Sequence, residues 1–299
     1  MGEVTEALRR AGQTPDRGPG ESDTTTEVDR APAVISRSKE GSWKARAVLV
    51  NPPGSQADQF RHFALRVRRS LEERSVRSIM ITSALQGEGK TLVSCNLALA
   101  LASMAGESRI ELLDLDLHHP SVAKAMGITP EPGVEEVLLG ESTLRAARVR
   151  TDLPALDLFP VGSPVPRAHE VLARPAFPAL IRELSKQYAT VVCDCPPALL
   201  VPDVELIAPR VGACLLVAKA GFTRRLPFRE AMTMLPRENL IGTFLNFASL
   251  SRHAKSYPGY AYYGEEEGPS KADEESDRDP NRRLGVADTV AREQFRAPR

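Results

Sequence analysis

Short hydrophobic runs alternate along the chain with longer stretches in which apolar residues recur every three or four positions. The short runs are rich in valine, isoleucine and leucine, which is typical of strands buried on both faces. The longer stretches have the period of amphipathic helices. We predict six strands, at Ser78–Ser83, Arg109–Leu113, Leu156–Val161, Thr190–Cys193, Ala213–Ala218 and Leu240–Leu245.

Helical patterns surround these strands and decide the fold class. Strands that alternate with helices predict an α/β fold with a mostly parallel central sheet and helices on both of its faces. Sheets of this kind bind ligands at the carboxyl ends of their strands. We predict six helices, at Gln59–Glu73, Lys90–Ala105, Val134–Leu139, Ala176–Gln187, Asp203–Ala208 and Phe228–Met234.

A glycine-rich turn, S-A-L-Q-G-E-G-K-T at residues 83–91, joins the first strand to the next helix. This order gathers backbone N–H groups and a helix N-terminus around one polyphosphate, with Lys90 for the β- and γ-phosphates and the Thr91 hydroxyl for Mg²⁺. The strict pattern has glycine where this chain has Ala84, and an accidental turn before a helix is the alternative. We expect the nucleotide to contact Ser83, Gln86, Gly87, Glu88, Gly89, Lys90, Thr91 and Leu92.

Two further predicted strands run into aspartate, at Asp114-Leu-Asp116 and at Asp194-Cys-Pro-Pro. An aspartate just beyond a strand projects its carboxylate from the ligand-binding edge of the sheet, and Mg²⁺ prefers oxygen ligands. We expect Asp194 and one of Asp114 and Asp116 to join Thr91 around the metal. The other carboxylate would accept a proton from an attacking hydroxyl. Helix capping is the alternative role for these aspartates.

The overall composition narrows the class of protein. Lys+Arg and Asp+Glu each total 39, so no net field favours nucleic acid as a partner. The four cysteines are scattered, which favours buried reduced thiols and a cytoplasmic compartment over a Cys193-x-Cys195 metal site. No hydrophobic run is long enough to cross a membrane, and the N-terminus lacks a hydrophobic signal core.

The two ends of the chain differ in composition from its centre. Residues 1–45 are rich in proline, glycine, serine and charge and predict a disordered tail before a domain at 46–256. Residues 257–299 begin with four of the five tyrosines and continue as a charged tail. Phenols in a proline- and glycine-broken strip, beside a triphosphate site, indicate phosphoryl acceptors, with an aromatic binding strip as the alternative. The expected acceptors are Tyr257, Tyr260, Tyr262 and Tyr263.

These features together resemble the bacterial tyrosine kinases (BY-kinases) of capsule and exopolysaccharide synthesis, which are relatives of the deviant Walker P-loop ATPases. The resemblance spans roughly residues 50–264 and ends with the tyrosine cluster. The glycine-rich turn, the Asp114-x-Asp116 element (Walker A′) and Asp194-Cys-Pro-Pro (Walker B) are its core. Further blocks stand at residues 51–54, 59–61, 133–140, 156–162, 170–172 and 203–208.

The resemblance implies ATP- and Mg²⁺-dependent transfer to tyrosine, chiefly onto the C-terminal cluster of a neighbouring subunit. It implies Lys90, Asp114 and Asp116 as catalytic residues, with Asp114 as candidate base, and Thr91, Asp116 and Asp194 around Mg²⁺. The implied partners are a membrane polysaccharide co-polymerase or chain-length determinant protein as activator, further copies of the chain in a ring, and a tyrosine phosphatase. The implied location is the cytoplasm, at the inner face of the membrane.

Three positions depart from the family pattern. His118 stands where the family usually has arginine, and the ring-forming Glu-x-x-Arg-x-x-Arg register gives Asp58, Arg61 and Ala64. Leu85 stands where the partitioning ATPases carry a signature lysine, which favours the kinase branch. Two alternatives stay open: a ParA/MinD-like positioning ATPase without kinase activity, and a nucleotide-binding scaffold that has lost catalysis.

Overall fold

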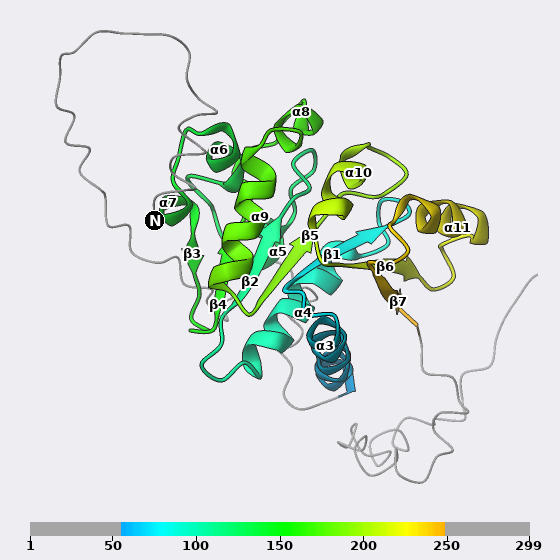
Figure 1. Cartoon of the computed structure of the whole chain (residues 1–299). Helices are drawn as coiled ribbons and strands as arrows, with labels where there is room; N and C mark the ends of the chain where they lie inside the picture. The colour runs from blue at the N-terminus through cyan, green and yellow to red at the C-terminus, as the bar shows by residue number, and fades with distance from the viewer. Residues whose placement is uncertain (1–54, 249–299) are drawn as a thin grey trace, which may run out of the picture.

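The computed structural model describes residues 55–248 (Figure 1). Within this range one sheet has the strand order β3-β4-β2-β5-β1-β6-β7, and every neighbouring pair is parallel except β3 with β4. The predicted α/β class with a mostly parallel sheet is therefore confirmed. The strands are β1 (Ser78–Ser83), β2 (Ile110–Asp114), β3 (Val149–Arg150), β4 (Leu156–Phe159), β5 (Thr190–Asp194), β6 (Ala213–Lys219) and β7 (Leu240–Asn246).

Helices cover both faces of the sheet, so it is the middle of three layers (Figure 1). α3, α4 and α5 pack on one face, and α6, α8, α9, α10 and α11 pack on the other. The helices are α3 (Ser55–Glu73), α4 (Lys90–Ser103), α5 (Val122–Met126), α6 (Val134–Leu139), α7 (Leu144–Ala147), α8 (Ala168–Leu172), α9 (Ala176–Gln187), α10 (Asp203–Ile207), the 3₁₀ turn η2 (Ala208–Arg210) and α11 (Arg225–Met234).

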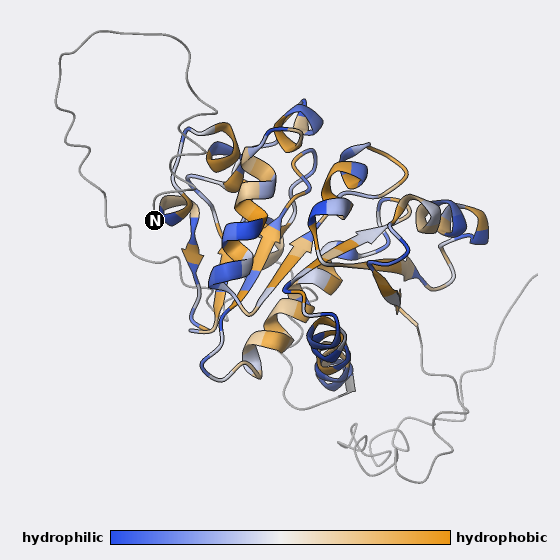
Figure 2. Ribbon diagram, in the orientation of Figure 1, coloured by the Kyte–Doolittle hydropathy of each residue, from blue (hydrophilic) through white to orange (hydrophobic). Residues whose placement is uncertain are grey.

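Successive residues of the central strands face opposite layers. Ile79 and Ile81 of β1 pack against the side of α3 and α4, whereas Met80 between them packs against the side of α9 and α10. The two-residue period of a strand produces this alternation, and all six residues of β1 are buried. Figure 2 shows the central strands as hydrophobic, while α3 carries many hydrophilic residues. Burial of each large side chain contributes about 1.5–3 kcal/mol.

The predicted elements exist, but several of their ends differ. The strand predicted to reach Val161 stops at Phe159, because Pro160 has no N–H to continue the ladder. β2 and β5 instead extend by one residue to include Asp114 and Asp194. α3 begins at Ser55 rather than Gln59, and α11 begins at Arg225 rather than Phe228.

Four short elements were not predicted: β3, α5, α7 and α8, each of two to five residues. Segments of this length carry too few residues to display a hydrophobic period. The predicted tail at 1–45, the segment from 257 to 299 and the four clustered tyrosines lie outside the described residues.

The register of the central strands gathers acidic residues at one edge. Asp114 at the end of β2 is the register partner of Asp194 at the end of β5, and Ile81 of β1 is the partner of Asp194 on the other side. The turn that follows β1 therefore opens at the same edge as both aspartates.

Candidate active site

The turn from β1 to α4 has the backbone of a phosphate-binding loop. Gly87 and Gly89 have φ angles of 81° and 91°, in the left-handed region that favours glycine. Gly89 is the N-cap of α4 and offers no side chain to the amides of the first turn. Because those N–H groups have no partner within the helix, they are available to a bound anion.

Lys90, the first residue of α4, points at both acidic strand ends. Its Nζ lies 2.7 Å from Asp116 Oδ2 and 3.8 Å from Asp194 Oδ2. Burial alone would lower the pKa of Lys90, but the carboxylates of Asp194 and Asp116 outweigh it and raise this pKa above its ordinary value. Lys90 is therefore a permanent cation in a buried acidic setting.

Asp194 is held at both of its carboxylate oxygens by α4. The Thr91 hydroxyl donates to Oδ2 at 2.6 Å, and Ser94 Oγ lies 3.0 Å from Oδ1. Burial raises the pKa of Asp194, while the charge of Lys90 and the Thr91 hydrogen bond oppose that rise. Ser94 was not among the predicted site residues. Its signal is its position one turn after Lys90, on the same face of the helix.

Asp114 is fully buried and organises the loop that carries Asp116. Its Oδ1 accepts from the N–H of Asp116 at 3.1 Å, and its Oδ2 accepts from the N–H groups of Ser121 at 3.2 Å and Val122 at 3.1 Å. Burial, followed by the charge of Asp194, raises the pKa of Asp114 to about 8. This carboxyl group braces both ends of the loop.

Glu88 and Asn246 support the turn from behind. The Glu88 carboxylate is buried and accepts from the N–H of Leu85 at 2.9 Å and from the Thr223 hydroxyl. Asn246 Nδ2 donates to the Glu88 carbonyl at 3.2 Å. The Glu88 side chain, predicted to contact the nucleotide, is thus directed into the fold. Of the other predicted contacts, Gln86 and Gly87 are exposed at the tip of the turn.

The remaining predicted contacts border the turn. The hydroxyl of Ser83, the last residue of β1, donates to the Leu85 carbonyl at 2.8 Å and shapes the start of the turn. Leu92 is partly buried on the first turn of α4 and packs against the core on the side of α3.

His118, in the same loop as Asp116, contacts a further acid. Its Nε2 lies 3.3 Å from Oδ2 of Asp203, the fully buried first residue of α10. Burial raises the pKa of Asp203, and the charges of His118 and His169 oppose that rise. Sequence reasoning did not find this contact, because nothing local to either residue marks it.

The residues at this edge fit a magnesium-bound nucleotide. Oxygen donors from Thr91, Asp116 and Asp194 lie around the ammonium group of Lys90, beside amides suited to phosphate. Among residues 55–248, no group of three or more His, Cys, Asp or Glu side chains is placed to hold a metal by itself. Mg²⁺ commonly takes one or two protein ligands and completes its shell with phosphate oxygens and water, so this donor set suits it.

The cysteines, the absence of a membrane-spanning helix and the α3 register were also predicted from the sequence. The four cysteines are free and buried, as predicted. In residues 55–248 no helix is both long enough and apolar enough to span a membrane. On α3, Arg61 forms an ion pair with Asp58 at 2.7 Å, and Ala64 is buried. Ring assembly through this register stays a prediction.

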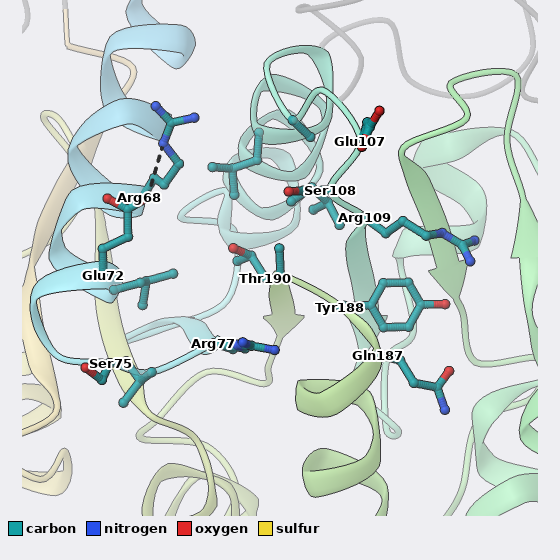
Figure 3. A pocket seen from close by; sticks show the side chains of 16 residues that line it. Arg68, Glu72, Ser75, Arg77, Glu107, Ser108, Arg109, Gln187, Tyr188 and Thr190 are labelled. Atoms are coloured by element: carbon teal, nitrogen blue, oxygen red, sulfur yellow. Dashed lines mark ion pairs between the residues drawn. The ribbon is translucent and has the colours of Figure 1, made fainter. Parts of the chain in front are cut away.

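A cavity of about 710 Å³ lies at the opposite edge of the sheet, where the central strands begin (Figure 3). Residues before and at the start of β2 and β5 line it, together with α3 and the end of α9. It is therefore separate from the turn that carries Lys90. Its labelled lining is Arg68, Glu72, Ser75, Arg77, Glu107, Ser108, Arg109, Gln187, Tyr188 and Thr190.

Comparisons with known proteins agree with this geometry. A family model described as "ParA: NUBPL iron-transfer P-loop NTPase" matches residues 75–146, the part that contains the turn and Asp116. The tyrosine-protein kinase YwqD of Bacillus subtilis is 29% identical over 232 residues, covering 76% of this chain and 95% of YwqD. The succinoglycan biosynthesis transport protein ExoP of Rhizobium meliloti is 30% identical over 219 residues, covering 71% of this chain and 27% of ExoP.

The solved kinase domain of VpsO is also similar, with 30% identity and a TM-score of 0.57, covering 65% of this chain and 100% of that domain. The fold and the site define a P-loop nucleoside triphosphatase-type domain with two acidic strand ends. Within that class, the chain belongs to the bacterial protein-tyrosine kinases. It spans nearly all of YwqD but about a quarter of ExoP.

Proposed function

We propose that this chain is an ATP- and Mg²⁺-dependent protein-tyrosine kinase that phosphorylates tyrosines of its own C-terminal cluster in a second copy. The observation that carries the proposal is the convergence of Lys90, Thr91, Asp116 and Asp194 at one sheet edge. The similarity to YwqD and to the VpsO kinase domain supports tyrosine as the acceptor.

Lys90 changes partners in the proposed reaction. Without nucleotide its ammonium group neutralises Asp116 and Asp194. When the triphosphate enters the turn, Lys90 turns toward the β- and γ-phosphates, and the first-turn amides of α4 hold the other phosphate oxygens. Thr91 and Asp194 would hold Mg²⁺, which would neutralise part of the phosphate charge when bound. The transition state is loose, so positioning and charge account for most of the rate.

Asp116 is the proposed proton acceptor, in place of the role predicted for Asp114. Both oxygens of Asp114 already accept backbone N–H groups, and its carboxyl group is fully enclosed. Asp116 Oδ2, by contrast, is the oxygen that Lys90 contacts, and it is released when Lys90 moves to phosphate. The phenol oxygen bonds to the γ-phosphorus, the bond to the β–γ bridging oxygen breaks, and the phenol proton passes to Asp116.

The expected acceptors are Tyr257, Tyr260, Tyr262 and Tyr263. Each phosphorylation adds about −1.5 to −2 charges, beside the acidic run at residues 265–267. Mutual repulsion between such tails favours separation of assembled copies. By analogy with the biosynthesis transport role in the name of ExoP, we place the kinase in polysaccharide export. There it works in the cytoplasm, at the inner face of the membrane, with a chain-length determinant protein as activator and a phosphatase as antagonist.

Incubation of the purified full-length chain with ATP and Mg²⁺, with and without the activator, tests the proposal. Phosphotyrosine is measured by mass spectrometry, and we expect it at residues 257–263. A variant with phenylalanine at all four positions should lose the signal and still bind ATP. Absence of phosphotyrosine in the presence of the activator would refute kinase activity.

The ParA-family match favours one alternative, a positioning ATPase without kinase activity. Such a protein would hydrolyse ATP at equal rates with four tyrosines or four phenylalanines in the tail. Hydrolysis without any phosphotyrosine would support this alternative.

A further inference from the structure

The loop at residues 115–121, between β2 and α5, carries Asp116 between Leu115 and Leu117, which are fully buried in the core. Backbone hydrogen bonds join the loop to two other segments: Leu115 N–H donates to the Asp194 carbonyl at 2.8 Å, and Val165 N–H donates to the Leu117 carbonyl at 2.8 Å. The Asp114 carboxylate also accepts from N–H groups at both ends of the loop. The side chain of His118 adds a polar contact to α10, where its Nε2 lies 3.3 Å from Asp203 Oδ2.

Asp203 has an environment that requires a cationic or hydrogen-bonding neighbour. It is fully buried, and neither carboxylate oxygen has a partner at hydrogen-bond geometry among the described residues. A carboxylate taken out of water without compensation is strongly unfavourable. The His118 imidazole, 20% exposed, contacts this carboxylate, and the charge of His169 also acts on it.

The two residues belong to the two segments that form the site. Asp203 follows Asp194 along the chain, in the segment that leaves β5 and begins α10. His118 follows Asp116, in the loop that leaves β2. Their contact therefore links these two segments at a point separate from Lys90, which contacts Asp116 and Asp194.

We infer that His118 is a positioning residue, which holds the loop at residues 115–121 against α10 and so fixes the carboxylate of Asp116 for proton acceptance. The inference rests on the proposed kinase function. When Lys90 turns to the phosphates, Asp116 loses its ion pair, while the His118–Asp203 contact still joins the middle of the loop to α10 and adds to the hydrogen bonds that Asp114 accepts from its two ends. A displacement of about 1 Å at a reacting group can lower a rate about 100-fold.

Matched substitutions test the role of His118. His118→Ala removes the contact, and His119→Ala makes the same change at the exposed neighbouring histidine. His118→Arg keeps a donor that can reach the Asp203 carboxylate. We expect His118→Ala to lower kcat for tyrosine phosphorylation about 10- to 100-fold, with the Kd for ATP changed less than about threefold. His119→Ala should match the unmodified chain, and His118→Arg should recover most of the rate.

A second measurement tests how firmly the loop at residues 115–121 is held. Amide hydrogen exchange at residues 115–122 should be faster in His118→Ala than in His119→Ala, with or without kinase activity. Equal exchange and equal kcat in these two variants overturn the inference. So does a His118→Ala chain that loses ATP affinity in proportion to kcat and is not restored by arginine. Absence of phosphotyrosine in the unmodified chain refutes the proposed function instead, and the exchange comparison still decides whether His118 restrains the loop.

Discussion

The Thr91 hydroxyl donates a hydrogen bond to Asp194 Oδ2 at 2.6 Å, although 103 residues separate the two in sequence. The contact ties the first turn of α4 to the tip of the neighbouring strand β5. Since Ser94 contacts the other carboxylate oxygen at 3.0 Å, Asp194 is oriented before any ligand arrives. Groups fixed in advance do not need to reorganise during the reaction, which is the main source of electrostatic catalysis.

Replacing Ser94 with alanine should weaken the use of Mg²⁺. The change leaves Asp194 Oδ1 without its hydroxyl neighbour, and loss of such an orienting contact typically costs 10- to 100-fold in metal affinity or activity, so we expect about a 10-fold higher Mg²⁺ requirement. Phosphorylation rates titrated with Mg²⁺ measure it. Ser103→Ala, at an exposed serine on the same helix, is the control. Identical Mg²⁺ curves for the two variants would contradict this role.

Replacing Lys90 with methionine should abolish phosphoryl transfer. The methionine side chain approximates the length of lysine but has no charge for the γ-phosphate, so we expect a rate loss of at least about 1,000-fold. Lys124→Met, at an exposed lysine of α5, should leave the rate unchanged. Phosphotyrosine formation over time is the measurement. Activity in Lys90→Met within tenfold of the Lys124→Met control would count against the proposed chemistry.

Replacing Gly89 with alanine should disrupt the phosphate-binding turn. A Cβ there would lie 2.2 Å from Asn246 Nδ2, which is the donor to the Glu88 carbonyl. Gly106→Ala is a matched control, because Gly106 also has a positive φ, of 59°, but has open space around it. Both variants incur about 1–2 kcal/mol of backbone strain. Only Gly89→Ala should lose ATP binding, measured with a fluorescent analogue; equal affinities in both would contradict the steric argument.

Glu111 should make the stability of the fold depend on pH. It is fully buried in β2, and both carboxylate oxygens lack a hydrogen-bond partner among residues 55–248. Burial, followed by the charge of Asp157, raises its pKa well above the ordinary value. A folded state that binds the proton more tightly than the unfolded chain loses free energy of unfolding as pH rises from about 4.3 toward the raised pKa.

Urea unfolding at pH 5 and pH 8 measures this effect. Relative to Glu111→Gln, the unmodified chain should lose at least about 1 kcal/mol of unfolding free energy between the two pH values, since each unit of pKa shift corresponds to about 1.4 kcal/mol. Glu107→Gln, at an exposed glutamate, should follow the unmodified chain. If the unfolding free energy of the unmodified chain and of Glu111→Gln changed equally between pH 5 and pH 8, Glu111 would not be responsible for the pH dependence.

Local sequence pattern predicted the sheet correctly, and it also marked the residues of the proposed site. Lys90 and Thr91 are marked by the glycine-rich turn, and Asp116 and Asp194 are marked by their places after hydrophobic strands. The parallel sheet then brings these strand ends together, and the distances among the four side chains agree with that expectation.

What sequence reasoning missed depends on tertiary contacts. The Glu88 carboxylate meets Thr223, which lies 135 residues away. His118 meets Asp203 only because the loop after β2 passes the start of α10. The short helices α5, α7 and α8 and the two-residue strand β3 are likewise fixed by packing rather than by their own periodicity.

The pairing of Asp114 with Asp194 across β2 and β5 constrains how this domain can change. Since side chains alternate between the two faces of a strand, one inserted residue within either strand would send every later side chain to the wrong layer. The ladder, and not the connecting loops, thus sets the spacing of the acidic groups. Engineered insertions should therefore be tolerated in surface turns such as the one at Gly140, while a single added residue inside β5 should abolish both folding and phosphoryl transfer.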